Sequence, residues 1–270
     1  MNRMSRPHWS FSSLNQILNI CSLQYFYQRI EHTEPEFTPL ALSFGSAIHR
    51  ALEHIGRIRM EADAELPDAE EGRRLFGEIW ERQLDEDRDI AFGEKHSPES
   101  CREEGAGLIE CFIAAVDPHE RVLSVSESFA LPIVDSSGAS LEKPLVGEID
   151  CVVERDGEPV LVDWKTAARR WPQSQADKSM QATAYAYAYG RLHGLGLPEF
   201  RFDVLVKNKT PVFQQLDTRR READVDRFAE LAKQAERIVA HELYYPNEHG
   251  FACGGCQFKT ACRNWHRQAA

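Results

Sequence analysis

One stretch of the sequence, VGEIDCVVERDGEPVLVDWKTA at residues 146–167, limits the possible folds more than any other. Its centre, Asp156-Gly157, predicts a two-residue type I′ turn, because that turn needs positive φ at both positions and Asp-Gly tolerates it. The flanking sequences are rich in valine and other residues that favour strands. The stretch therefore predicts an antiparallel hairpin in which residue 155 faces residue 158, and this fixes the register of the pair.

This register brings two acids together. Asp150 falls opposite Asp163, and Lys165 shares a strand face with Asp163 because side chains alternate along a strand. Directly opposed side chains lie about 5 Å apart, and like charges there destabilise a sheet. Removing one carboxylate is therefore expected not to lower the melting temperature of the metal-free protein. A divalent cation held by carboxylate oxygens, with Lys165 beside it, would remove the repulsion and support catalysis. The alternative is a solvated face of a two-sided hairpin.

The charge balance restricts the class of partner. The 270 residues include 43 Asp and Glu against 32 Lys and Arg, a formal net charge of −11. This balance argues against a passive nucleic-acid coat protein but not against a nuclease, since metal-binding carboxylates add to the acidic count. Local basic runs remain at 168–170 (ARR), 207–209 (KNK) and 219–221 (RRR). The alternative for each run is a solvated face.

The expected compartment follows from two further patterns. No apolar run approaches the roughly 18 residues of a membrane span, and the beginning, MNRMSRPHWSF, lacks the apolar core of a signal peptide. We therefore expect a cytoplasmic protein with no membrane partner. Its seven cysteines are then thiols or metal ligands before they are disulfides.

Hydrophobic periodicity divides the chain into elements. Helices are predicted over 12–30, 46–58, 69–92, 98–116, 174–194 and 221–243, and strands over 121–133, 144–155, 159–166, 199–208 and 211–218. The order αβββαβ predicts an α/β (α+β) fold in which helices surround one mixed sheet. We expect one integrated domain with a helical region over 1–117, a core over 118–243 and a cysteine segment over 244–270.

Four short motifs follow one another along these elements: Gly45-x-x-x-His49, GEID ending at Asp150, DWK at 163–165, and Gln181-x-x-x-Tyr185. In this order, and on these element types, the set resembles the PD-(D/E)XK nuclease superfamily, specifically its RecB-like branch. The resemblance covers about residues 10–266. It implies a restriction-endonuclease-like core.

The resemblance also implies a role for each motif residue. His49, Asp150 and Asp163 would ligate Mg²⁺ or Mn²⁺, helped by the backbone carbonyl of Trp164. Lys165 would be the catalytic lysine, which orients the attacking water and stabilises charge on the scissile phosphate.

Three further residues carry weaker expectations. Gln181 and Tyr185 lie four apart on one helix face, where the family uses them to position the site and contact the DNA backbone. The alternative for Tyr185 is simple packing in the core. Glu127, alone in an otherwise apolar strand, matches an acidic residue that the family often places beside the metal.

The cysteines provide a second signal. CGGCQFKTAC places Cys253, Cys256 and Cys262 close together, and three thiols need a fourth ligand, for which Cys21 is the candidate. Resemblance to the AddB-like and CRISPR-associated RecB-like exonucleases implies a [4Fe–4S] cluster on these four residues. A structural Zn²⁺ site is the alternative, because Cys-x-x-Cys fits either metal. The other three cysteines are expected to be ordinary buried thiols.

Together these observations predict a metal-dependent deoxyribonuclease, an exonuclease that acts on single strands or DNA ends in recombination, repair or phage DNA processing. One alternative is a nuclease that trims precursors for CRISPR spacer acquisition beside an integrase partner. Another is a non-catalytic DNA-binding scaffold with a relic nuclease core. The sequence has no Walker A loop, so unwinding would need a helicase partner.

Overall fold

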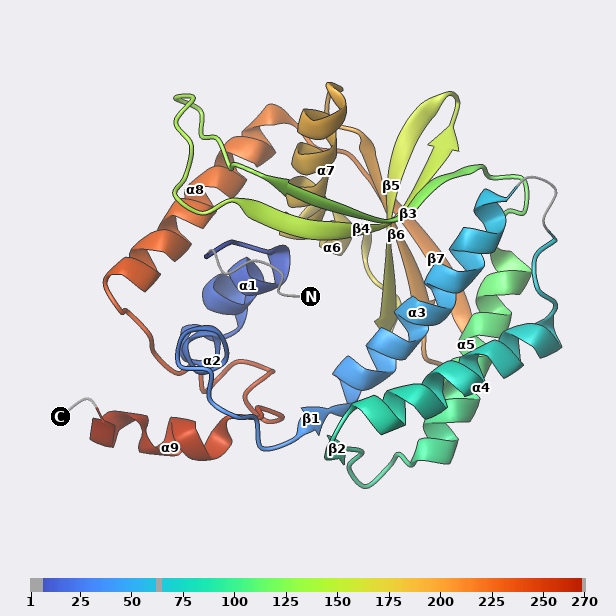
Figure 1. The fold of residues 1–270 in the computed structure, drawn as a ribbon, viewed down its shortest axis with the longest axis horizontal. Coiled ribbons are helices and arrows are strands. Elements are labelled where there is room, and N and C mark those ends of the chain that lie inside the picture. Colours follow the sequence, from blue (N-terminus) through green and yellow to red (C-terminus); the bar gives the residue numbers. More distant parts are fainter. Residues whose placement is uncertain (1–6, 62–64, 269–270) are drawn as a thin grey trace. The chain divides into compact units, whose positions relative to one another are not determined.

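The structure is a computed structural model that describes residues 7–61 and 65–268 (Figure 1). The chain forms two compact units. The cysteine unit comprises Met1–Thr38, Phe129–Gly147 and Arg221–Ala270, and the sheet unit comprises Pro39–Ser128 and Glu148–Arg220. The boundaries predicted at residues 117 and 243 remain predictions. Residues 1–6, which belong to the expected helical region and to the stretch judged to lack a signal peptide, lie outside the described residues. Residues 269–270 of the expected cysteine segment also lie outside them.

A five-stranded sheet confirms the predicted mixed α/β fold (Figure 1). Its strands, in spatial order, are β3 (Val122–Leu131), β4 (Leu145–Arg155), β5 (Glu158–Ala167), β6 (Glu199–Val206) and β7 (Val212–Thr218). Strands β5 and β6 are parallel, whereas β4 and β5 pair antiparallel, as do β6 and β7. The carboxyl ends of β5 and β6 therefore meet at one edge of the sheet.

The β4–β5 hairpin confirms the predicted turn and register. Asp156 and Gly157 have φ values of 56° and 82°, as a type I′ turn requires. Residue pairing runs from Arg155↔Glu158 to Cys151↔Val162. The regular pairing stops one step before the expected Asp150 and Asp163 pair, for a reason that lies in the site itself.

Three helices pack together on one face of the sheet: α3 (Leu40–Met60), α4 (Ala69–Glu86) and α5 (Pro98–Ala115). Asp68 is the N-cap of α4 and Ser97 is the N-cap of α5, and each forms a reciprocal capping box with the first turn. Helix α4 ends at Glu86, short of the predicted 92, and the short strand β2 (Ile90–Ala91) follows. A Cβ at Gly56 would lie 3.1 Å from Val125, so glycine allows α3 to approach β3 closely.

The predicted helix over 174–194 is wrong as a single element. It consists of α6 (Gln173–Asp177) and α7 (Met180–His193). The Ser179 hydroxyl accepts the Ala182 N–H at the start of α7. The Arg220 guanidinium donates to the carbonyls of Ala176 and Asp177, each at 2.6 Å, and so satisfies the end of α6. Helix α7 covers the opposite sheet face from α3.

Arg201, Glu120 and Asp203 form a buried network of ion pairs within the sheet unit. Arg201 on β6 is 2% exposed, and its guanidinium donates to both Glu120 oxygens at 2.5 and 2.9 Å and to both Asp203 oxygens at 2.8 and 3.2 Å. Burial alone would lower the pKa of Arg201, but these two carboxylates raise it far above its usual range. Arg201 is therefore permanently charged.

Arg201→Ala is expected to destabilise the protein by about 3–5 kcal/mol, because it leaves buried carboxylates without their cation. Urea denaturation followed by circular dichroism measures this change. Arg121→Ala is the control, since its ion pair with Glu154 is solvent-exposed and should contribute below about 1 kcal/mol. Equal effects for the two variants would contradict a stabilising role for the buried network.

The cysteine unit begins with four short helical pieces: α1 (Phe11–Asn15), π-helical η1 (Gln16–Ile20), α2 (Ser22–Tyr25) and π-helical η2 (Phe26–Ile30). The prediction of one helix over 12–30 is therefore wrong. Cys21 interrupts it with an extended backbone, φ −167° and ψ 117°. The short strand β1 (Thr38–Pro39) follows, and the unit also contains α8 (Glu222–Ala240) and α9 (Lys259–Gln268).

Candidate active site

Strand β5 separates its side chains between two environments. Trp164 joins the apolar core that α3, α4 and α5 form on one face. Asp163 points to the other face, where it is only 1% exposed and accepts a hydrogen bond from Gln181 Nε2 of α7 at 2.5 Å. The Lys165 ammonium contacts the second Asp163 oxygen. Strand β5 thus holds Asp163 beside Lys165, and the side-chain amide of Gln181 fixes the orientation of Asp163.

Asp150 on β4 explains why the hairpin pairing stops. Its Oδ2 accepts the backbone N–H of Trp164 at 2.8 Å, a donor that a continued antiparallel ladder would give to a β4 carbonyl. The same oxygen lies 3.5 Å from Nδ1 of His49 on α3. The structure therefore brings His49, Asp150, Asp163 and Lys165 together in the sheet unit, as expected from their motifs.

The two acids have opposite electrostatic environments. Burial raises the pKa of Asp163 to about 6, and the negative charge of Asp150 adds to this effect against the opposing charge of Lys165. Burial would also raise the pKa of Asp150, but hydrogen bonding to His49 and to the Trp164 N–H, with the charge of Lys165, lowers it overall. Asp163 is thus the acid whose charge is destabilising in the metal-free protein.

Asp163→Asn is therefore expected to stabilise the metal-free protein at pH 7 by about 1–3 kcal/mol. Because folding raises the pKa of this carboxyl, the wild-type protein loses stability as pH rises from about 4 to 6. The stability gained by Asp163→Asn should therefore vanish near pH 4. Asp150→Asn should instead cost about 1–2 kcal/mol, because a charge-assisted acceptor is lost. This revises the expectation that removing either acid is harmless. Thermal melts in EDTA at both pH values test the opposite signs; equal signs at pH 7 would contradict them.

Tyr185 lies on α7, one turn after Gln181. Tyr185 is buried, with its ring 6.4 Å from that of Phe200, and burial together with the charge of Asp163 raises its pKa well above its usual range. The core-packing alternative thus describes its ring, while its hydroxyl is neutral. The expected roles of Gln181 and Tyr185 in contacting DNA remain predictions.

Glu127 has a partner that the sequence did not suggest. Its Oε1 lies 2.7 Å from Nε2 of His193 at the end of α7, and its Oε2 accepts from the Ser124 hydroxyl at 2.6 Å. Val125, two residues earlier, packs toward α3 instead. Positive φ at Ser126 (56°) breaks the strand alternation and turns Glu127 toward α7. Its role beside a metal remains a prediction.

The donor chemistry at this site fits a hard cation. Two carboxylates and an imidazole are ligands that Mg²⁺ or Mn²⁺ accepts, and Asp163 Oδ2 is buried without a regular hydrogen bond. Within residues 7–61 and 65–268, no group of three or more His, Cys, Asp or Glu side chains is arranged to hold a metal ion as it stands. The metal ligands therefore remain predictions.

A separate cluster of thiols lies within the cysteine unit. One small cavity is lined by all four candidate cysteines, Cys21, Cys253, Cys256 and Cys262. Cys21 Sγ accepts the Asn247 N–H at 3.4 Å. Burial raises the pKa values of Cys256 and Cys262, and the neighbouring thiols raise them further. Four thiols that repel one another as thiolates form a donor set suited to a soft metal.

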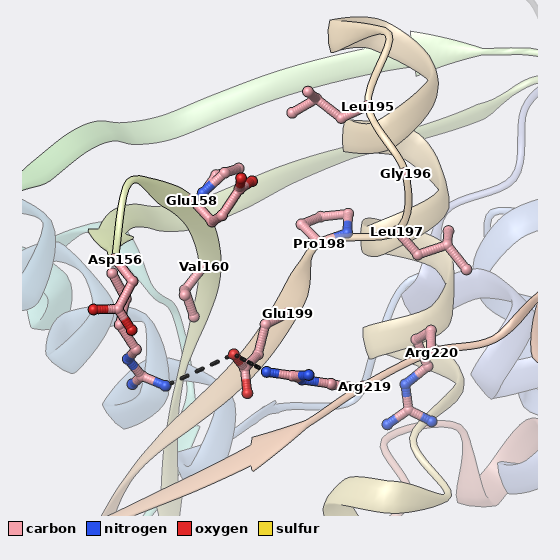
Figure 2. Close-up of a pocket in the computed structure, with 12 residues that line it drawn as sticks. Asp156, Glu158, Val160, Leu195, Gly196, Leu197, Pro198, Glu199, Arg219 and Arg220 are labelled. Atoms are coloured by element: carbon pink, nitrogen blue, oxygen red, sulfur yellow. Dashed lines mark hydrogen bonds and ion pairs between the residues drawn. The ribbon is translucent and has the colours of Figure 1, made fainter.

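A second cavity, of about 380 Å³, lies away from the paired acids and from the thiols (Figure 2). It is lined by residues from the amino-terminal ends of β5 and β6, whereas Asp163 and Lys165 lie in the carboxyl-terminal half of β5. Figure 2 shows Glu199 in this pocket beside Arg219. The Arg219 guanidinium lies 3.3 Å from the Glu199 carboxylate. Because ligands of parallel sheets bind at the carboxyl ends of strands, we do not assign catalysis to this pocket.

Paired acids and a lysine on a mixed sheet with flanking helices define a nuclease core of the restriction-endonuclease-like type. The chain matches the family model described as PD-(D/E)XK nuclease superfamily over residues 8–263. It therefore belongs to the PD-(D/E)XK nuclease superfamily. No curated protein matches the chain.

Two solved structures resemble the fold. A proposed exonuclease from Eubacterium rectale has 11% sequence identity and a TM-score of 0.53, with 94% of this chain and 93% of that chain covered. The structure of SSO0001 also has 11% identity, with a TM-score of 0.37 and coverage of 93% and 94%. At 11% identity, the first likeness shows the fold alone. In the described part of the chain, no helix has the length and apolar character needed to span a membrane.

Proposed function

We propose that the protein is a metal-dependent deoxyribonuclease that hydrolyses phosphodiester bonds. The observation that carries this proposal is the buried Asp163, held between Gln181 and Lys165, with Asp150 and His49 from neighbouring elements beside it. Such rigid placement on strands and helices is what a catalytic group requires. A bound Mg²⁺ or Mn²⁺ would polarise the phosphoryl oxygen and lower the pKa of a water.

The side chains of the site have separate tasks in this proposal. The Lys165 ammonium, about a quarter exposed, can reach a substrate phosphate and stabilise its developing charge. Gln181 fixes the orientation of Asp163, and His49 fixes that of Asp150. His49, Asp150, Asp163 and the Trp164 carbonyl are the candidate metal ligands. One turn before His49, a Cβ at Gly45 would meet nothing within 4 Å, so this part of α3 leaves room for a substrate strand.

We further propose exonuclease action on single strands or DNA ends, in recombination, repair or phage DNA processing in the cytoplasm. The motif set of the RecB-like branch supports this proposal, and a structure with the same fold is described as an exonuclease. A helicase partner would supply unwinding. Trimming of precursors for CRISPR spacer acquisition, beside an integrase, uses the same chemistry. A relic DNA-binding scaffold is disfavoured, because the acids and the lysine are all present and placed together.

Cleavage of matched linear and circular DNA tests this proposal. Anaerobically purified protein with Mn²⁺ should degrade an end-labelled linear single strand and leave a covalently closed circle of the same sequence intact. Cleavage of both would make the enzyme an endonuclease, whereas binding of both without cleavage under Mg²⁺ or Mn²⁺ would favour the scaffold.

We also propose that the four cysteines of the cysteine unit hold a [4Fe–4S] cluster, with a structural Zn²⁺ as the alternative. Leu23, Tyr27 and Phe258 form a small apolar core beside these thiols. Such shielding from solvent suits thiolate-bound metal. The metal would join two chain segments whose contacting residues, Cys21 and Asn247, are 226 positions apart.

A further inference from the structure

Two basic runs come together where the parallel strands end. Residues 168–170 (ARR) follow β5 directly, and residues 207–209 (KNK) follow β6. Ala167 pairs with Val206, and the Lys207 N–H donates to the Ala167 carbonyl at 2.8 Å. The two runs therefore occupy one edge of the sheet, beyond the strand half that carries Asp163 and Lys165. Neither 164–176 nor 204–216 contains an acid, in a protein with a net charge of −11.

The exposed cations of this edge have no acidic partners. Arg169, Arg170 and Lys209 are exposed, and none of them takes part in an ion pair among the described residues. The opposite ends of the same strands differ. There Arg219 and Arg155 lie 3.3 and 3.9 Å from the Glu199 carboxylate, on the pocket of Figure 2. Unpaired cations therefore gather at the active-site end, while those at the far end are neutralised.

The loop with the two arginines is anchored on rigid elements. The Trp171 N–H donates to Gln214 Oε1 at 3.0 Å, and Gln214 Nε2 donates back to the Trp171 carbonyl at 2.9 Å. The Trp171 ring lies 5.3 Å from that of Phe202. In the second loop, the Lys207 ammonium lies 5.1 Å from the centre of the Phe44 ring. Both loops are thus held in place without using the exposed charges, which is the arrangement expected of a preorganised anion-binding surface.

We propose that Arg169, Arg170 and Lys209 form a track for the phosphates that flank the scissile bond. This inference rests on the proposed function, and it adds the path that the bound DNA strand takes across the protein. Arg169 is four residues beyond Lys165 and two beyond the end of β5, or about 13 Å at most along an extended chain. The ligand class is a nucleic-acid backbone, bound through phosphate charge and without regard to base sequence.

The dependence of DNA affinity on salt tests the track. Binding of a labelled single strand is measured in EDTA, which prevents cleavage, between 50 and 300 mM NaCl. The double variant Arg169→Ala/Arg170→Ala should lower the slope of log K against log salt by about 1.4, or about 0.7 for each lost phosphate contact. Arg155→Ala/Arg219→Ala removes the same charge from the far end and should leave the slope unchanged. Lys209→Ala should lower the slope by about 0.7.

Equal slopes for the two double variants would overturn the track, because net charge alone would then explain binding. A thermal melt of each variant shows whether the protein is folded. In a second arm, neutral methylphosphonate linkages next to the cleavage position should weaken binding of wild-type protein more than binding of Arg169→Ala/Arg170→Ala, which keeps only the Lys209 contact. The track and the nuclease assignment can fail separately: a protein with the predicted slopes but no cleavage in any divalent cation keeps the first and loses the second.

Discussion

Lys165→Ala is expected to slow DNA cleavage by about 10²–10³-fold or more, the loss typical of removing one group that stabilises transition-state charge. Lys165 supplies the cation that contacts Asp163 and lies at the strand end where a phosphate would approach. The fold should persist, because the side chain is partly exposed and packs no core. Single-turnover rates under Mn²⁺, with enzyme in excess, measure the chemical step.

Lys95→Ala is the matched control for this loss. Lys95 is exposed in the same unit and removing it takes away the same charge from a position outside the site. Its cleavage rate should stay within about twofold of wild type, as for most surface substitutions. A Lys165→Ala rate close to that of Lys95→Ala would show that Lys165 has no catalytic role.

Cys21→Ala is expected to produce the largest loss of stability. A site of four thiolates can contribute on the order of 10 kcal/mol to folding through the bound metal. Cys21 is the one proposed ligand from the amino-terminal segment, and its Sγ contacts Asn247 of the carboxyl-terminal segment. Without it, anaerobically purified protein should lose its iron and its brown colour. The cysteine unit should then unfold at temperatures where the wild-type unit is folded.

Cys111→Ala tests whether any cysteine has this effect. Cys111 lies on α5 of the sheet unit, so the variant should keep wild-type iron and acid-labile sulfide. Elemental analysis then identifies the metal. A content of about one zinc per chain, without iron, would show that the four cysteines form a zinc site and not an iron–sulfur cluster. Equal metal contents in wild type and Cys21→Ala would overturn Cys21 as a ligand.

The parts of the fold that depend on local chemistry could be predicted from the sequence. The hairpin register follows from Asp156-Gly157 and from strict alternation, so the faces of Asp163 and Trp164 were predictable. The positions of Asp150 and Lys165 near Asp163 followed from the same register and alternation. The positions of His49 and Gln181 required the motif resemblance, because nothing local shows which strand a helical side chain will meet.

The parts that depend on distant contacts could not be predicted. The break at Cys21 is held by loop residues such as Asn247, so the helical periodicity of 12–30 gave no sign of it. The pairing of Glu127 with His193 depends on positive φ at Ser126, and serine carries no signal for that conformation. His193 lies twelve residues after Gln181 on one helix, which is the only sequence clue to its place. The alternation pattern also predicted that the β4–β5 pairing would continue past Cys151 and Val162. It stops there because the Trp164 N–H donates to the Asp150 side chain instead of to the backbone of β4.

We propose that Asp163, Asp150, His49 and Lys165 form one metal-dependent site for phosphodiester cleavage. The most direct measurement is single-turnover cleavage of an end-labelled DNA strand while Mn²⁺ is titrated into EDTA-treated wild-type and Asp163→Asn protein. We expect no cleavage in EDTA, saturable cleavage by wild type as Mn²⁺ rises, and a rate for Asp163→Asn reduced by about 10²-fold or more at every concentration. Cleavage by Asp163→Asn at the wild-type rate, or wild-type cleavage that persists in EDTA, would rule out a metal-dependent site at these residues.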